Sequence, residues 1–202
     1  MEHQRLLVAL FASALSLRPQ VIGIGPLLPE IQEDLGISHA VAGLLGTIPV
    51  LCMGLFAPPA ARVLARCGSR NAIAVCVLVI AAFGMARALV PPAALVILLT
   101  FGVGVGMGLL GAMMPIAVKE RFADRPAFGT GGYALGINIG AGVAAATAVP
   151  IADATFGWRG SLTVFSVATG LLAVIWMLLT RGKHSESVTP MCLEALPWRS
   201  GL

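Results

Sequence analysis

Residues 6–28 read LLVALFASALSLRPQVIGIGPLL, an apolar stretch that carries a single charged side chain, Arg18, near its middle. A helix over Leu6–Leu28 rises about 1.5 Å per residue and so spans roughly 30 Å, the hydrocarbon thickness of a bilayer. A charge at that depth is costly, and such residues usually face a polar cavity or pathway. The stretch therefore predicts a membrane-spanning helix in which Arg18 meets an anion. The alternatives are that Arg18 pairs with another helix or that its guanidinium extends to the membrane surface.

The composition of the whole chain is that of an integral membrane protein. Of its 202 residues, 58% are hydrophobic and 11% are charged, whereas soluble domains carry about 25% charged residues. The net charge of +4 does not indicate nucleic-acid binding, because the basic residues lie between apolar runs rather than on one face. The cysteines have no metal-site or redox spacing and are interpreted as packing residues, so no metal and no cofactor is expected.

Six apolar stretches are long enough to cross a bilayer, so the sequence predicts an all-α transmembrane protein. Residues 1–182 are expected to form one six-helix transmembrane domain, and residues 183–202 a poorly ordered cytoplasmic linker. The expected helices cover residues 6–28, 40–60, 72–90, 94–118, 129–152 and 161–180.

The distribution of lysine and arginine predicts that both termini are cytoplasmic. With the N-terminus inside, ten of the 13 basic residues lie on the inner side, Arg87 and Arg159 lie on the outer side, and Arg18 lies within the membrane. This bias follows the positive-inside rule and indicates a multi-pass protein of the inner or plasma membrane. Trp158 and Trp176 lie near the expected membrane boundaries and are interpreted as interfacial anchors.

Small residues recur regularly in the fifth expected helix. Gly132, Gly136 and Gly140 are four residues apart, the spacing at which two helix backbones approach closely in membranes. The sequence therefore predicts tight packing of this helix against a neighbour. The second interpretation is that these glycines let the packed helices bend or move against each other.

Pro19 directly follows Arg18 and is expected to kink the first helix, since proline removes a backbone donor. On an unbroken helix, Ser13, Ser16 and Gln20 share one face and Arg18 lies on the opposite face. A single polar face that includes Arg18 therefore requires Pro19 to change the local winding.

The first and fourth expected helices are weakly similar in sequence, since residues 23–29 read GIGPLLP and residues 106–115 read GMGLLGAMMP. Two three-helix units of opposite orientation form the inverted repeat of many secondary transporters. The sequence therefore predicts six transmembrane helices arranged as two inverted three-helix repeats.

The connection between the second and third expected helices resembles the loop that marks the major facilitator superfamily, Gly-x-x-x-Asp-Arg-x-Gly-Arg-Arg or Lys. Arg66, Gly68 and Arg70 match its Arg, its second Gly and its last basic position. Ala61 and Ala65 replace its first Gly and its Asp. The resemblance implies the N-terminal half of such a transporter, in which the three matching residues serve conformational change.

A closer resemblance is to the cyanate and 2-nitroimidazole permease family, CynX/NimT. It covers nearly the whole chain and implies alternating-access transport of a small, anionic or polar solute such as cyanate, with Arg18 contacting it. The resembling segments are residues 17–19 (LRP), 25–31 (GPLLPEI), 42–45 (AGLL), 49–58 (PVLCMGLFAP), 157–159 (GWR) and 197–200 (PWRS).

Members of that family have twelve helices, whereas this chain ends after the sixth expected helix, at what resembles the central linker. We therefore expect a half-length or truncated chain. The two halves of such transporters are related by an axis along the membrane normal, so the expected partners are membrane lipid and either a second six-helix half or a second copy in a parallel homodimer.

Polar residues inside the expected helices are the further candidates for solute binding. Gln20, Thr47, Tyr133 and Asn138 join Arg18, and the alternative is that they form hydrogen bonds between helices. No His-Glu-x-x-His motif and no paired membrane aspartates are present, so no enzyme is expected. The alternative function is a transport-inactive fragment or a membrane scaffold subunit.

Overall fold

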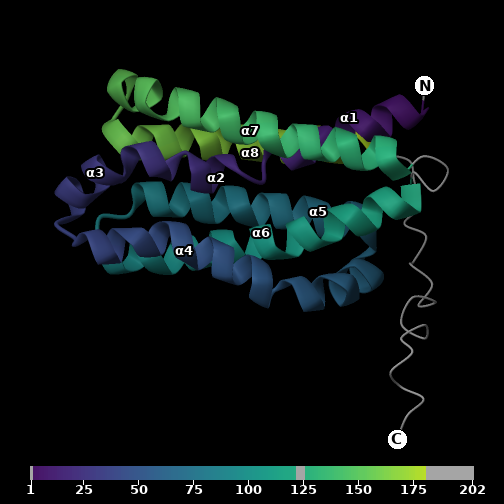
Figure 1. The fold of residues 1–202 in the computed structure, drawn as a ribbon, viewed down its shortest axis with the longest axis horizontal. Coiled ribbons are helices and arrows are strands. Elements are labelled where there is room, and N and C mark those ends of the chain that lie inside the picture. Colours follow the sequence, from purple (N-terminus) through teal and green to yellow (C-terminus); the bar gives the residue numbers. More distant parts are fainter. Residues whose placement is uncertain (1, 122–125, 181–202) are drawn as a thin grey trace, which may run out of the picture.

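The computed structural model describes residues 2–121 and 126–180. The expected linker, residues 183–202, lies outside the described residues. The helices are α1 (Glu2–Leu15), α2 (Pro19–Ile22), α3 (Ile24–Leu35), α4 (His39–Leu55), α5 (Ala57–Leu89), α6 (Ala93–Arg121), α7 (Pro126–Ala154) and α8 (Gly157–Leu179). These helices run along a common long axis, and the connections between the long helices α5, α6, α7 and α8 lie at the two ends of the bundle (Figure 1).

Two of the expected helices differ from the structure. The stretch 6–28 is not one helix but is divided among α1, α2 and α3, because Pro19 cannot donate a backbone hydrogen bond to the preceding turn. The stretch 40–60 ends as a helix at Leu55, since Pro58 and Pro59 lack the amides that would donate to Gly54 and Leu55, and the chain turns at Phe56 into α5.

Four helices of the described chain are long and apolar enough to cross a membrane. The spans are Ala57–Leu89, Ala93–Lys119, Ala127–Ala154 and Gly157–Leu179, and α4 is a shorter apolar helix. Large apolar side chains lie on the surface, such as Leu51 at 72% and Leu98 at 63% exposure. Such a surface is favourable where the helices contact lipid chains. The helix lengths and the apolar surface together indicate a membrane protein.

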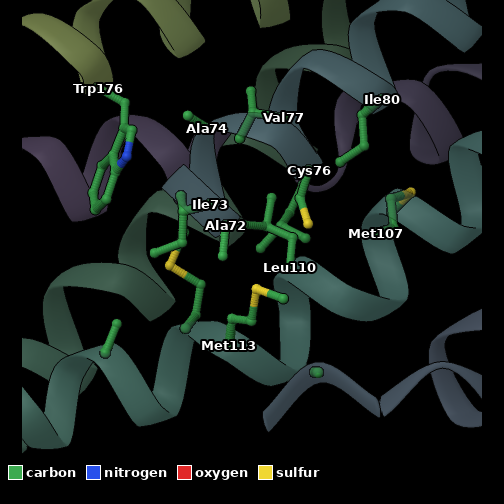
Figure 2. Close-up of a cluster of buried hydrophobic side chains, with 14 of the residues drawn as sticks. Ala72, Ile73, Ala74, Cys76, Val77, Ile80, Met107, Leu110, Met113 and Trp176 are labelled. Carbon is green, nitrogen blue, oxygen red and sulfur yellow. The ribbon is translucent and has the colours of Figure 1, made fainter. Parts of the chain in front are cut away.

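Helix α5 lies in the middle of the bundle and contacts both α6 and α8 (Figure 1). Helix α4 packs on α6, and α1 packs on α7. A first apolar cluster joins α5, α6 and α8 through residues such as Ile73, Met107, Met113 and Trp176, which Figure 2 shows gathered between these helices. A second cluster, which includes Leu27 and Leu162, joins α3 to α8 and to the ends of the neighbouring helices.

The glycine stripe of α7 lies against α1. A Cβ atom built at Gly136 would lie 2.8 Å from the carbonyl oxygen of Phe11, and one at Gly140 would lie 2.6 Å from that of Leu15. Gly132 is half-buried. Because van der Waals contact between close backbones replaces the hydrophobic effect in lipid, these two glycines set how closely α1 and α7 approach.

Replacing Gly140 by alanine is expected to lower the melting temperature of the purified chain in detergent. The added methyl group meets a backbone atom that cannot move aside, and overpacking of this kind costs about 1–3 kcal/mol. Gly142→Ala is the matched control, because nothing lies within 4 Å of a Cβ atom there and alanine favours helix over glycine. Equal melting temperatures for the two variants would contradict the packing argument.

Candidate functional site

The first span breaks directly before Pro19. Helix α1 ends at Leu15, and the backbone amides of Ser16 and Leu17 form tight turn bonds to Ser13 and Ala14 before α2 begins. The hydroxyl of Ser16 also donates to the Ser13 carbonyl oxygen at 2.6 Å. These local bonds satisfy backbone groups at the break, as they must where water is scarce.

Arg18 is the residue that caps α2, and its side chain is partly exposed. By contrast, Ser13, Ser16 and Gln20 are fully buried. The break therefore leaves the three polar side chains facing the interior and Arg18 at the surface. The one ion pair in the described part of the chain joins Arg159 and Asp34, so Arg18 has no carboxylate partner there.

A buried polar network lies behind the break. Arg87 of α5 is 0% exposed, and its Nη2 donates to the main-chain oxygen of Gln20 at 2.5 Å and to Gln20 Oε1 at 2.7 Å. The amide of Gln20 in turn donates to Ser166 Oγ of α8 at 2.9 Å, and Ser166 Oγ donates to the Leu162 carbonyl oxygen at 2.7 Å. The network thus ties α2 to both α5 and α8.

Arg87 is a candidate functional residue that the sequence analysis does not single out. The distribution of basic residues places it on the outer side of the membrane, but it lies inside α5 and is buried. One feature of the sequence points to Arg87, because it falls within the apolar stretch 72–90. A charge inside an expected membrane span suggests a functional role, and this argument applies to Arg87 as it does to Arg18.

The other predicted solute-binding residues lie on different surfaces. Thr47 and Asn138 are exposed, and their side chains donate to carbonyl oxygens one turn earlier, of Gly43 at 3.1 Å and of Ala134 at 2.8 Å. Tyr133 is half-buried and packs against the first apolar cluster. The short helix α2 contacts α4 and α7, which carry these side chains, so the three helices meet next to the break.

The loop motif forms a sharp bend inside α5. Gly68 has φ 73° and ψ 151° and divides the helix, while Arg66 before it is exposed. After the bend, Arg70 Nη2 donates to the Met177 carbonyl oxygen at 3.4 Å, and Trp176 Nε1 donates to the Arg70 carbonyl oxygen at 3.0 Å. The motif therefore fastens one end of the bundle to α8.

The opposite end of the bundle is fastened by a polar cluster between α3 and α8. Glu30 accepts from the backbone amide of Trp158 at 3.0 Å, which places a carboxylate at the N-terminal turn of α8, where the helix dipole favours it. Asp34 accepts from the Trp158 indole at 3.0 Å and from Arg159 at 3.1 Å. Arg159 also donates to the carbonyl oxygens of Ala88 and Val90.

The interpretation of Trp158 and Trp176 as interfacial anchors is wrong. Both side chains are buried, with exposures of 2% and 0%, because each indole finds its hydrogen-bond acceptor within the protein, at Asp34 and at Arg70 respectively. Within the described ranges, no group of three or more His, Cys, Asp or Glu residues could hold a metal ion.

The family model and the curated relatives that match this chain are all transporters. The sequence profile of the Major Facilitator Superfamily matches residues 6–201. The cyanate transport protein CynX of Escherichia coli K12 is 29% identical over 98% of this chain and 53% of its own length. The 2-nitroimidazole transporter of the same organism is 31% identical over 98% of this chain and 50% of its own length.

A third relative, the uncharacterized transporter YycB of Bacillus subtilis 168, is 24% identical over 96% of this chain and 48% of its own length. The chain thus spans about half the length of the curated relatives it matches. This coverage is consistent with an N-terminal half.

The bend at Gly68 predicts a strong penalty for any side chain there. Its backbone conformation is essentially restricted to glycine, so Gly68→Ala is expected to reduce the free energy of unfolding by about 1–3 kcal/mol. Denaturant titration of helical circular dichroism in micelles measures this loss. Gly54→Ala serves as the control, because a Cβ atom at Gly54 meets nothing within 4 Å; a loss of similar size in both variants would refute the conformational explanation.

Proposed function

The chain belongs to the Major Facilitator Superfamily, whose members are transporters and not enzymes, and on this premise we propose that it forms one six-helix half of a secondary transporter for a small anion. The observation that carries the proposal is Arg18, a partly exposed guanidinium at the break of the first span that has no carboxylate partner among the described residues. Discontinuous helices form the substrate sites of many secondary transporters.

The charge of Arg18 and the name of one relative both support an anion as the solute. An unpaired guanidinium inside a membrane protein recruits a counter-charge, because an isolated cation in a low-dielectric surround is unfavourable. One relative is named as a transporter of cyanate, a small anion. We therefore propose cyanate or a related small organic anion as the solute, moved by alternating access.

The helices that contact α2 supply the remaining candidate contacts. Thr47 of α4 and Asn138 of α7 are exposed on helices that contact α2, and their oxygen and amide groups suit hydrogen bonding to a small polar solute. Tyr133 lies five residues before Asn138 and is half-buried. Gln20 lies behind the break, so we propose that it supports the site rather than contacts the solute.

The pattern of helix packing supports the two inverted three-helix repeats. Suppose that α1–α3 correspond to α6, α4 to α7, and α5 to α8. The contact between α4 and α6 then has its counterpart in the contact between α7 and α1, and both contacts are present. The α5–α8 pair corresponds to itself and is also in contact. On this scheme α1, α2 and α3 together cross the membrane once, which gives six crossings.

The orientation and the partners complete the proposal. The excess of basic residues at one end of the spans supports cytoplasmic termini and insertion in the inner or plasma membrane. The second half of the transporter is supplied by a longer form of this chain, by a separate chain or by a second copy, with Arg18 facing the axis between the halves. The loop residues Arg66, Gly68 and Arg70 hold the cytoplasmic end during the conformational change.

Uptake of labelled cyanate and of a panel of small organic anions into proteoliposomes tests this function. Arg18→Ala removes a charge-assisted hydrogen bond worth about 1.5–3 kcal/mol, so the KM is expected to rise about tenfold to a hundredfold. Arg18→Lys retains the charge and is expected to retain part of the activity.

Arg62→Ala is the matched control, since Arg62 is an exposed arginine on α5, and uptake by this variant is expected to be unchanged. Absence of both uptake and cyanate binding in the unmodified chain would count against transport and in favour of a scaffold or an inactive fragment. Uptake that does not depend on residue 18 would reject Arg18 as the binding residue.

A further inference from the structure

The helical segment that follows Arg18 is too short to hold itself in place. Helix α2 has 4 residues, and a single helical turn is unstable in isolation because nucleation fixes several residues for few hydrogen bonds. The position of Arg18, the cap of this turn, therefore depends on what α2 contacts outside itself.

Helix α2 packs against α3, α4, α7 and α8, and one buried side chain, Arg87, adds hydrogen bonds to it. Arg87 donates to the backbone and to the side chain of Gln20, and Gln20 donates onward to Ser166, so α2 is held from α5 on one side and from α8 on the other. The acceptors of Arg87 in the described structure are neutral oxygens, and its Nε and Nη1 atoms are buried without a partner. A charge maintained at such a cost is a functional-site hypothesis by default.

Two glycines next to this network leave the space that it occupies. A Cβ atom at Gly84, one turn before Arg87, would lie 2.8 Å from both polar atoms of the Gln20 amide and from Ser166 Oγ. A Cβ atom at Gly23 would lie 2.6 Å from the ring of Phe165. Only glycine at these positions leaves room for the Gln20–Ser166 hydrogen bond and for α2 against α8.

We infer that Arg87 is a positioning residue that clamps the break of the first span and thereby holds Arg18 at the surface where the solute binds. The inference rests on the proposed function of Arg18, but the clamp itself is a separate physical claim. Arg87 acts through Gln20 and does not contact the solute.

The clamp is tested by the reactivity of a thiol at position 18, in micelles without solute. The native cysteines are replaced by alanine, Arg18→Cys is introduced, and the rate of modification by a charged methanethiosulfonate reagent is measured. Arg87→Met keeps the length of the side chain but removes every donor, so α2 is free to turn and the rate is expected to fall about fivefold or more.

Matched variants isolate the cause. Arg87→Lys retains a cation that can donate to both Gln20 oxygens, and Arg62→Met changes an exposed arginine of the same helix; both are expected to stay within about twofold of the parent rate. A rate for Arg87→Met that is within twofold of the parent, or faster, overturns the inference.

A second variant covers the case in which Arg87→Met does not fold. Gln20→Met keeps Arg87 and its bond to the main-chain oxygen but removes the amide that joins Oε1 to Ser166. We expect about a threefold slower modification at position 18, and an unchanged rate overturns the inference.

Transport kinetics give an independent readout. Arg87→Met is expected to raise the KM for cyanate about tenfold, because Arg18 would no longer be held in place to bind the anion. Arg87→Lys is expected to keep the KM close to that of the unmodified chain. If the thiol rate shifts as expected while uptake does not depend on Arg18, the clamp stands and the proposed function fails. If uptake depends on Arg18 while the thiol rate is unchanged, the proposed function stands and the clamp fails.

Discussion

The bond between the Arg87 guanidinium and the backbone of Gln20 is the interaction on which the centre of this bundle depends. A membrane interior offers no water to a broken helix or to a charge, so each must find partners in the protein. Here the Arg87 guanidinium donates to a main-chain oxygen beside the break in the helix, so each group provides a hydrogen-bond partner for the other. The result is a polar centre, surrounded by apolar helices, from which Arg18 reaches the surface.

Glycine determines how closely the helices surround that centre. Between apolar helices in lipid there is little hydrophobic drive for association, so close packing and a few hydrogen bonds must suffice. Gly84 admits the Gln20–Ser166 hydrogen bond, and Gly136 and Gly140 bring α7 against α1. The polar network and the glycine contacts are therefore two parts of one arrangement.

The two ends of the bundle are fastened by polar bonds of a different kind. At one end the bend at Gly68 places Arg70 beside α8, and at the other end Asp34 binds both Trp158 and Arg159. The Arg159–Asp34 ion pair lies near the surface, where such pairs contribute little to stability, so it fixes the relative position of α3 and α8 more than it adds free energy. The two ends of the bundle are thus held by polar contacts, while the break in the first span lies between them.

The sequence alone determined the class of the protein, because apolar runs of bilayer length and a low charge content allow few other folds. It also indicated the family and the glycine spacing, since both depend on residue type and local order, whereas solute binding by Arg18 stays a prediction. Only the tertiary structure decided the hydrogen-bond partners of Gln20, Arg87, Trp158 and Trp176, because these partners lie 67 to 146 residues away in the chain. Hydrogen bonds of that range depend on which helices pack together, and periodicity within one helix carries no information about its neighbours.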